Sequence, residues 1–243
     1  MRAIMKNIFF ILCLSVILNG GELEKNLKNL FPTYDVVSVD KLNSIPKSNL
    51  VVLMDKTSNQ KDIIISDDSG KNFFYVKNAF LKDKNDKKLY DQKVEFIEDK
   101  VQKEVFEILK TIPQDRFISI NSFYKDNKKT IYMITDPECP YCKKEMDRLV
   151  KYLRNANLKI IFAPVHGKSA FIKSAIMLER SKSIDPSNQK AFIDLISKYY
   201  DTNTAVTDDM ASDEQVQKVF FDAKKIFSKG LVKSVPFMFE IDK

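Results

Sequence analysis

Residues 135–142 read Thr-Asp-Pro-Glu-Cys-Pro-Tyr-Cys and follow an apolar, strand-like run, Thr130–Thr135. The Asp-Pro dipeptide ends the strand, and Pro140 suits the first turn of a helix, where a missing N–H leaves no bond unmade. Cys139 is therefore expected at the N-terminus of a helix. There the free backbone N–H groups and the positive end of the helix dipole favour its thiolate over its thiol.

Cys142 lies one helical turn after Cys139 and is expected to be shielded and to keep its proton longer. This arrangement is typical of thiol–disulfide exchange, in which Cys139 attacks a substrate and Cys142 resolves the mixed disulfide. Two other interpretations exist for the pair. A zinc half-site would need two further ligands, and an inert structural disulfide closing so short a loop would stabilise little.

The segment around the cysteines alternates between strand and helix patterns. Predicted strands are Phe117–Asn121, Thr130–Thr135, Leu158–Val165 and Phe237–Ile241, and predicted helices are Pro140–Ala156, Ser169–Ser181, Pro186–Tyr200 and Asp213–Lys229. A strand, a helix and a second strand connected in this way indicate a parallel pair in a right-handed crossover. Residues 113–243 are predicted to form one α/β domain with inserted helices.

The preceding part of the chain is predicted to form a smaller α+β unit, so the protein as a whole is expected to be α+β. A helix ends before Pro32, and four strand-like runs follow it: Tyr34–Val39, Leu50–Met54, Ile63–Ser66 and Asn72–Val76. This unit is predicted to cover residues 21–88. Its last segment, 82–88, has six charged residues and is predicted to be a solvated connector. Apolar positions spaced by threes and fours then predict one long helix over 89–112, either a spacer between domains or a helix packed on one core.

Residues 1–20 resemble a secretory signal. Arg2 and Lys6 precede an apolar run, Ile8–Leu18, that is too short to span a bilayer, and small residues follow near position 20. Removal of this segment leaves Cys139 and Cys142 as the only cysteines. We therefore expect an exported, periplasmic protein whose two cysteines serve chemistry.

Composition excludes several other classes of function. The chain has 243 residues with five glycines and one histidine, which excludes glycine-rich dinucleotide loops, G-x-S-x-G elbows and multi-histidine zinc sites. Its net charge of +7 comes from lysines interleaved with acids and indicates a solvated surface, with no nucleic-acid partner. No cofactor and no metal are expected.

The Cys-Pro-Tyr-Cys segment resembles the active site of periplasmic disulfide interchange proteins of the DsbC/DsbG type, which have a thioredoxin fold. Ser234-Val235-Pro236-Phe237 resembles the cis-proline loop of that fold. The resemblance implies catalytic residues Cys139 and Cys142 around the dipeptide Pro140-Tyr141. It also implies substrate contacts at Val235 and Pro236.

The same resemblance implies a domain order: signal peptide 1–20, dimerisation domain 21–88, linker helix 89–112 and thioredoxin-like catalytic domain 113–243. It implies a homodimer that acts on unfolded or partly oxidised exported proteins. A membrane redox partner would reoxidise or reduce the dithiol. Isomerases of this type typically have threonine before the cis-proline, so Val235 favours an oxidase. The alternatives are an isomerase or reductase, or a dimeric chaperone with secondary redox activity.

Three polar residues near the cysteines carry weaker expectations. His166 follows the strand Leu158–Val165 and either stabilises the thiolate or is an ordinary loop residue. Asp136 and Glu138 are predicted to be turn and rim residues. As acids they would oppose thiolate formation slightly.

Overall fold

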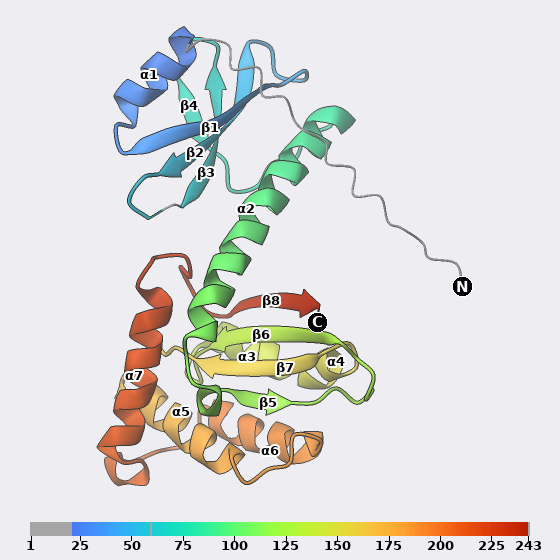
Figure 1. Ribbon diagram of the computed structural model, residues 1–243, viewed down its shortest axis with the longest axis vertical. Coiled ribbons are helices and arrows are strands. Elements are labelled where there is room, and N and C mark those ends of the chain that lie inside the picture. Colours follow the sequence, from blue (N-terminus) through green and yellow to red (C-terminus); the bar gives the residue numbers. More distant parts are fainter. Residues whose placement is uncertain (1–20, 59, 243) are drawn as a thin grey trace, which may run out of the picture. The chain divides into compact units, whose positions relative to one another are not determined.

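The computed structural model describes residues 21–58 and 60–242. These residues form two compact units that divide between Ile97 and Glu98, and each unit holds one four-stranded sheet (Figure 1). The signal sequence predicted over residues 1–20 lies outside the described residues. Within the described part of the chain, no helix is both long enough and apolar enough to cross a bilayer.

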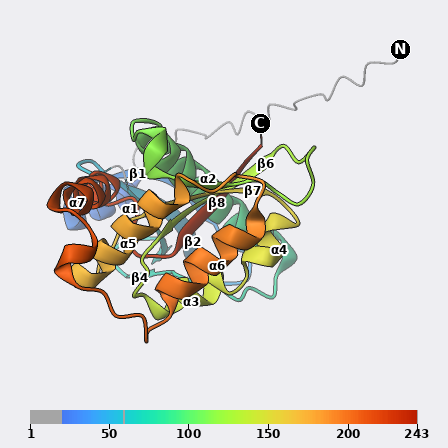
Figure 2. The ribbon, with the colours of Figure 1, turned by 90° about the horizontal axis from the view of Figure 1, so that it is seen from below.

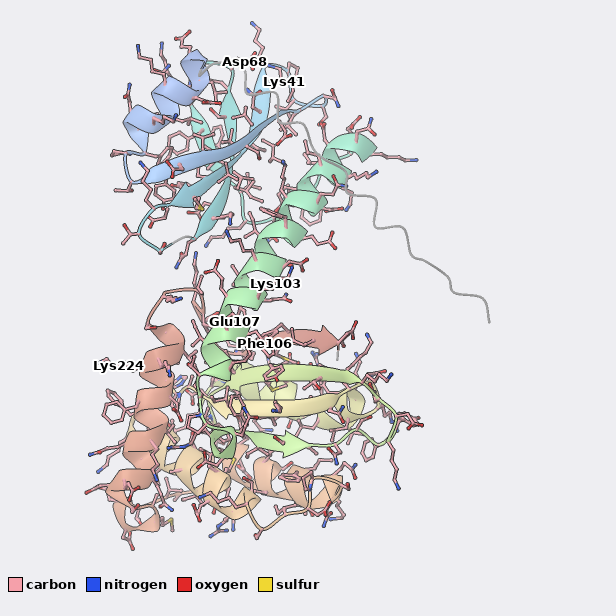
Figure 3. The ribbon with its side chains drawn as sticks, viewed as in Figure 1. Lys41, Asp68, Lys103, Phe106, Glu107 and Lys224 are labelled. Carbon is pink, nitrogen blue, oxygen red and sulfur yellow. The ribbon has the colours of Figure 1, made fainter. Side chains whose placement is uncertain are left out.

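The first unit packs helices on both faces of an antiparallel sheet. Helix α1 (Glu22–Leu30) precedes strands in the order β1-β2-β3-β4, which are β1 (Tyr34–Lys41), β2 (Ser48–Asp55), β3 (Lys61–Asp67) and β4 (Phe73–Tyr75). Alternate side chains of β2 pack with Leu27 of α1 on one face and with Tyr90 of the next helix, α2 (Lys84–Lys110), on the other. Burial on both faces explains why β2 is an almost continuous apolar run. An ion pair between Lys41 and Asp68 joins β1 to the turn after β3 (Figure 3).

Helix α2 (Lys84–Lys110) begins earlier than the sequence predicts and ends two residues sooner. The segment 82–88, predicted to be a solvated connector, contains its first turn. The Asp83 carboxylate accepts hydrogen bonds from the N–H groups of Asn85 and Asp86, at 2.9 and 3.0 Å, and so caps the helix. Asp86 is itself buried and accepts a 2.7 Å bond from Ser44 N–H. The Asp86 carboxylate therefore joins the start of α2 to a loop of the first unit.

The second unit is a mixed sheet in the order β5-β7-β6-β8. Its elements are 3₁₀ helix η1 (Gln114–Arg116), β5 (Ile118–Ile120), β6 (Lys129–Thr135), α3 (Pro140–Met146), α4 (Leu149–Leu153), β7 (Asn157–Phe162), α5 (Lys168–Ser181), α6 (Gln189–Tyr200), 3₁₀ helix η2 (Asp208–Met210), α7 (Asp213–Phe227) and β8 (Phe237–Asp242). The central strands β6 and β7 are parallel, as expected, and Thr135 is opposite Phe162 in their register. The loops that follow these two strands therefore leave the same edge of the sheet.

Helices cover both faces of this sheet. Phe106, on the part of α2 that belongs to the second unit, packs edge-on against Tyr132 and Phe239, with ring centroids 5.2 and 6.3 Å apart (Figure 3). On the other face, Thr135 contacts Tyr200 of α6. Figure 2 shows α5 and α6 in front of the strands. The mixed α+β class predicted from the sequence is confirmed.

The helix predicted over Pro140–Ala156 is divided into α3 and α4. The division occurs where the N–H of Arg148 bonds to the carbonyl of Glu145, three residues back, at 3.0 Å. A bond of this kind tightens the turn and interrupts the regular α-helical ladder. The break leaves α3 as a short helix with Cys139 at its N-cap and Cys142 in its first turn.

Candidate active site

The two cysteines lie at the start of α3. Cys139 is the N-cap residue with extended backbone angles (φ −79°, ψ 121°), and Pro140 is the first helical residue. Cys142 lies one turn inside. Both are free thiols, and both are buried, with 6% and 0% of their surface exposed. Tyr141 between them is exposed, and the Lys144 ammonium lies 5.4 Å from the centre of its ring.

The loop before β8 contacts Cys139. The Val235-Pro236 peptide bond is cis, and the Cys139 thiol donates to the Val235 carbonyl at a sulfur–oxygen distance of 3.7 Å. Pairing of β8 with β6 brings this loop to the edge of the sheet from which the cysteine turn leaves. The structure thus brings together the two segments on which the sequence resemblance rests.

Cys142 is held in a buried polar network. The Thr135 side chain and the Asp136 backbone lie near its sulfur. The Thr135 hydroxyl bonds to the Tyr200 hydroxyl at 2.8 Å. Burial raises the pKa of the Cys142 thiol from 9.0 to about 12, although the polar groups of Thr135 and Asp136 lower it in part. Burial likewise raises the pKa of the Tyr200 phenol well above its ordinary value. Both groups are therefore protonated at neutral pH.

Asp136 is fully buried and links two loops. Its Oδ1 accepts from the N–H of Glu138 at 2.8 Å. Its Oδ2 accepts from the N–H groups of Val165 and His166, at 2.8 and 3.1 Å, and lies 2.7 Å from His166 Nδ1. One carboxylate therefore joins the cysteine turn to the loop that follows β7.

Glu138 is paired with a buried lysine. Lys173 of α5 has 6% of its side chain exposed, and its Nζ lies 3.4 Å from Glu138 Oε1. A buried ammonium requires a partner of opposite charge, and Glu138 supplies it. Each of the two acids before Cys139 thus has a base from the segment that follows β7.

Comparisons with known proteins identify the architecture. No protein-family model matches the chain, and no curated protein matches it. The solved structure of Helicobacter pylori DsbG is similar over 90% of this chain and 99% of that chain, with a TM-score of 0.52 and 22% sequence identity. This chain has the DsbG-like thioredoxin fold. Proteus mirabilis ScsC is also similar, at 18% identity over 65% of this chain and 82% of that chain, with a TM-score of 0.44. A periplasmic thioredoxin-like protein from Salmonella enterica serovar Typhimurium is similar at 21% identity over 53% of this chain and 80% of that chain, with a TM-score of 0.41.

Asp136 is the turn residue that the sequence predicts, since the Cys139 N–H bonds to its carbonyl at 3.2 Å. The sequence does not predict that its carboxylate is fully buried and also accepts hydrogen bonds from the loop after β7. His166, for which two interpretations were open, binds that carboxylate through Nδ1. Lys173 and Tyr200 were not predicted. Lys173 could have been noticed as a single charge within an apolar stretch of α5, whereas no sequence signal marks Tyr200.

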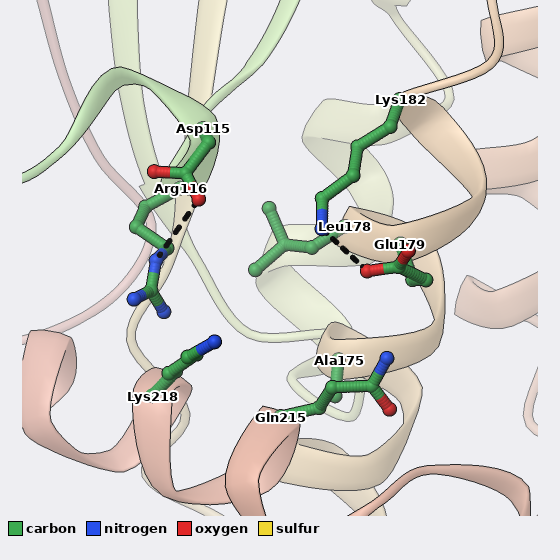
Figure 4. Close-up of a pocket in the computed structure, with 8 residues that line it drawn as sticks. All are labelled: Asp115, Arg116, Ala175, Leu178, Glu179, Lys182, Gln215 and Lys218. Carbon is green, nitrogen blue, oxygen red and sulfur yellow. Dashed lines mark hydrogen bonds and ion pairs between the residues drawn. The ribbon is translucent and has the colours of Figure 1, made fainter.

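The DsbG-like unit also has a small hollow away from the cysteines, between η1, α5 and α7 (Figure 4). It measures about 40 Å³, enough only for a few waters. Its charged side chains pair with acids: Lys182 with Glu179 at 2.5 Å, and Lys218 with Glu214 at 2.6 Å. Among the described residues, no group of three or more histidine, cysteine or acidic side chains is placed to bind a metal ion.

Proposed function

We propose that this protein is a thiol–disulfide oxidoreductase in which Cys139 forms and breaks bonds with the substrate and Cys142 is the resolving thiol. One observation carries the proposal: two free cysteines occupy the N-cap and first turn of α3, and the first of them contacts the Val235 carbonyl at 3.7 Å. Free N–H groups at the start of a helix are donors from which a thiolate can accept hydrogen bonds. Burial keeps Cys142 protonated.

In the oxidising direction the enzyme begins with a Cys139–Cys142 disulfide. A substrate thiolate attacks the Cys139 sulfur, the disulfide breaks, and the Cys142 sulfur leaves and takes up a proton. A second substrate thiolate then attacks the substrate sulfur of the mixed disulfide and releases Cys139 as a thiolate, which is a good leaving group. The substrate gains a disulfide and the enzyme gains two electrons. In the reducing direction the Cys139 thiolate attacks a substrate disulfide, and Cys142 displaces the substrate.

We assign the oxidising direction on the basis of Val235. Its side chain offers the neighbouring sulfur apolar packing and no hydroxyl donor. An oxidase must be reoxidised by a partner that accepts two electrons and two protons, which we propose to be a membrane redox protein. An isomerase or reductase would instead be kept as a dithiol. Thiol alkylation in cells distinguishes the two, because an oxidase is mostly disulfide-bonded at steady state and an isomerase or reductase is mostly reduced.

The substrates we propose are unfolded or partly oxidised exported proteins in the periplasm.

The active form we propose is a homodimer assembled through residues 22–88. This small unit buries little apolar area alone, and pairing with a second copy would bury more of its apolar surface. Light scattering at micromolar concentration should give the mass of a dimer. A monomer mass would refute the dimer and leave the thiol chemistry untouched.

The decisive experiment is oxidative refolding of a reduced, unfolded protein with several disulfides. With glutathione disulfide as the oxidant, wild type should accelerate disulfide formation and Cys139→Ala should abolish turnover. Given a substrate that already carries disulfides, Cys142→Ala should accumulate a mixed disulfide, formed when the Cys139 thiolate attacks a substrate disulfide, that mass spectrometry detects. An exposed-surface change such as Lys190→Gln serves as the control, since Lys190 is exposed and pairs with Asp194 on the outside of α6. The protein would instead be a chaperone if wild type showed no turnover in this assay and the Cys139→Ala variant still prevented aggregation of the unfolded substrate.

A further inference from the structure

His166 belongs to a charge pair that reaches the cysteines through Asp136. The carbonyl of Asp136 accepts from the Cys139 N–H at 3.2 Å, and its backbone lies near the Cys142 sulfur. Its carboxylate lies 2.7 Å from His166 Nδ1. Asp136 thus binds the cysteine turn through its backbone and His166 through its carboxylate.

An unpaired buried carboxylate beside a cysteine disfavours the thiolate, because two negative charges in a medium of low dielectric constant repel each other. The Asp136 side chain has no exposed surface, so water does not screen its charge. The three backbone N–H groups that it binds carry no net charge. Of the hydrogen-bond partners that the structure describes for this carboxylate, only the imidazole can supply a positive charge, and histidine is the side chain whose charge ordinarily changes near neutral pH.

The other ionisable groups around this site are paired or buried. Lys173 pairs with Glu138, and Lys168, the first residue of α5, pairs with Asp208 at 2.6 Å. Cys142 and Tyr200 stay protonated. His166 is 42% exposed, so its Nε2 can exchange a proton with water while Nδ1 stays bound to Asp136.

We propose that His166, held by Asp136, is a positioning residue whose proton controls how readily Cys139 forms a thiolate. This inference rests on the proposed role of Cys139 as the attacking thiol. When His166 carries the proton, the pair is neutral and the thiolate is favoured. When His166 loses the proton, the carboxylate charge is uncompensated and the thiolate is disfavoured. Thiolate formation is thereby spread over a wider pH range than a single ionisation would give.

The test is the rate at which iodoacetamide alkylates Cys139 in the reduced protein, followed by mass spectrometry between about pH 5 and 8. His166→Asn keeps a side-chain N–H donor near the position of Nδ1 but cannot gain a charge. We expect this variant to react about threefold to tenfold more slowly than wild type at the acidic end and equally fast at the alkaline end. Its rate should follow a single ionisation, whereas that of wild type should rise more gradually.

Lys168→Gln is the matched control, because it removes a positive charge two residues from His166 without touching Asp136, and its pH profile should match wild type. His166→Gln is a second non-titrating variant should the asparagine perturb folding. Coincident profiles for wild type and a folded variant would overturn the inference. Alkylation reports the thiolate whether or not the protein turns over a substrate, so a wild type inactive in refolding would refute the proposed function alone.

Discussion

Replacement of Cys142 by serine should reduce the amount of unfolding free energy that the reduced protein loses as the pH rises above neutral. The thiol of Cys142 has no exposed surface, and burial raises its pKa from 9.0 to about 12. The native state therefore keeps this proton at a pH where the unfolded chain releases it. The corresponding stability is fully present below about pH 9 and is lost as the pH rises toward the native value.

The magnitude follows from the two pKa values. Between about pH 8 and about pH 10 the unfolded thiol ionises and the native thiol does not, and one pKa unit corresponds to 1.36 kcal/mol. Wild type should therefore lose about 1.4 kcal/mol of unfolding free energy over this interval through Cys142 alone. A serine hydroxyl of similar size stays neutral throughout, so the C142S variant should lose less by that amount.

The assay is urea unfolding followed by far-ultraviolet circular dichroism, at both pH values, with a reductant present. The lysines, tyrosines and first unit are the same in both proteins, so their contributions cancel in the difference between wild type and variant. Parallel stability losses in the two proteins would refute the assignment of Cys142 as a buried, protonated thiol.

Three further changes test other parts of the molecule. Tyr200→Phe removes the hydroxyl that bonds to Thr135 and should lower the unfolding free energy by about 1 kcal/mol, measured by urea unfolding; unchanged stability would contradict a buried bond. Val235→Thr adds a hydroxyl donor beside the attacking sulfur and should change the potential of the cysteine pair, measured against glutathione, by about a few tens of millivolts. If both the potential and the refolding of a scrambled substrate stay the same, this residue does not set the direction of exchange. Gly70→Ala should destabilise the first unit by about 1–3 kcal/mol, measured by thermal unfolding. The reason is that Gly70 has a φ of +72° and an added Cβ would lie 2.5 Å from the Leu23 carbonyl oxygen. An unaltered melting temperature would show that the turn rearranges without cost.

Local patterns predict most of the secondary structure of this protein. Strand β2 appears as an apolar run because both of its faces are covered, and α3 begins at Pro140 because a proline fits the first turn. The start of α2 was placed too late because its first turn is rich in charges. One of those charges, Asp86, is buried by bonds to a loop more than 40 residues earlier in the chain, and no local pattern reports such a contact.

Spacing and the nature of two side chains were enough to identify the candidate site from the sequence. Cys139 and Cys142 lie one helical turn apart. Because a helix forms from neighbouring residues, the sequence predicts that one cysteine lies at its N-terminus and the other inside it. The tertiary structure decided which atoms of the surrounding residues make contact. Val235 lies 96 residues from Cys139 in the chain and meets it because β8 pairs with β6. Asp136 meets His166, 30 residues later, because parallel pairing of β6 and β7 brings their following loops to one edge of the sheet. Partners of this kind depend on strand order and register, which follow from packing of the whole domain and leave no mark on the sequence near the motif.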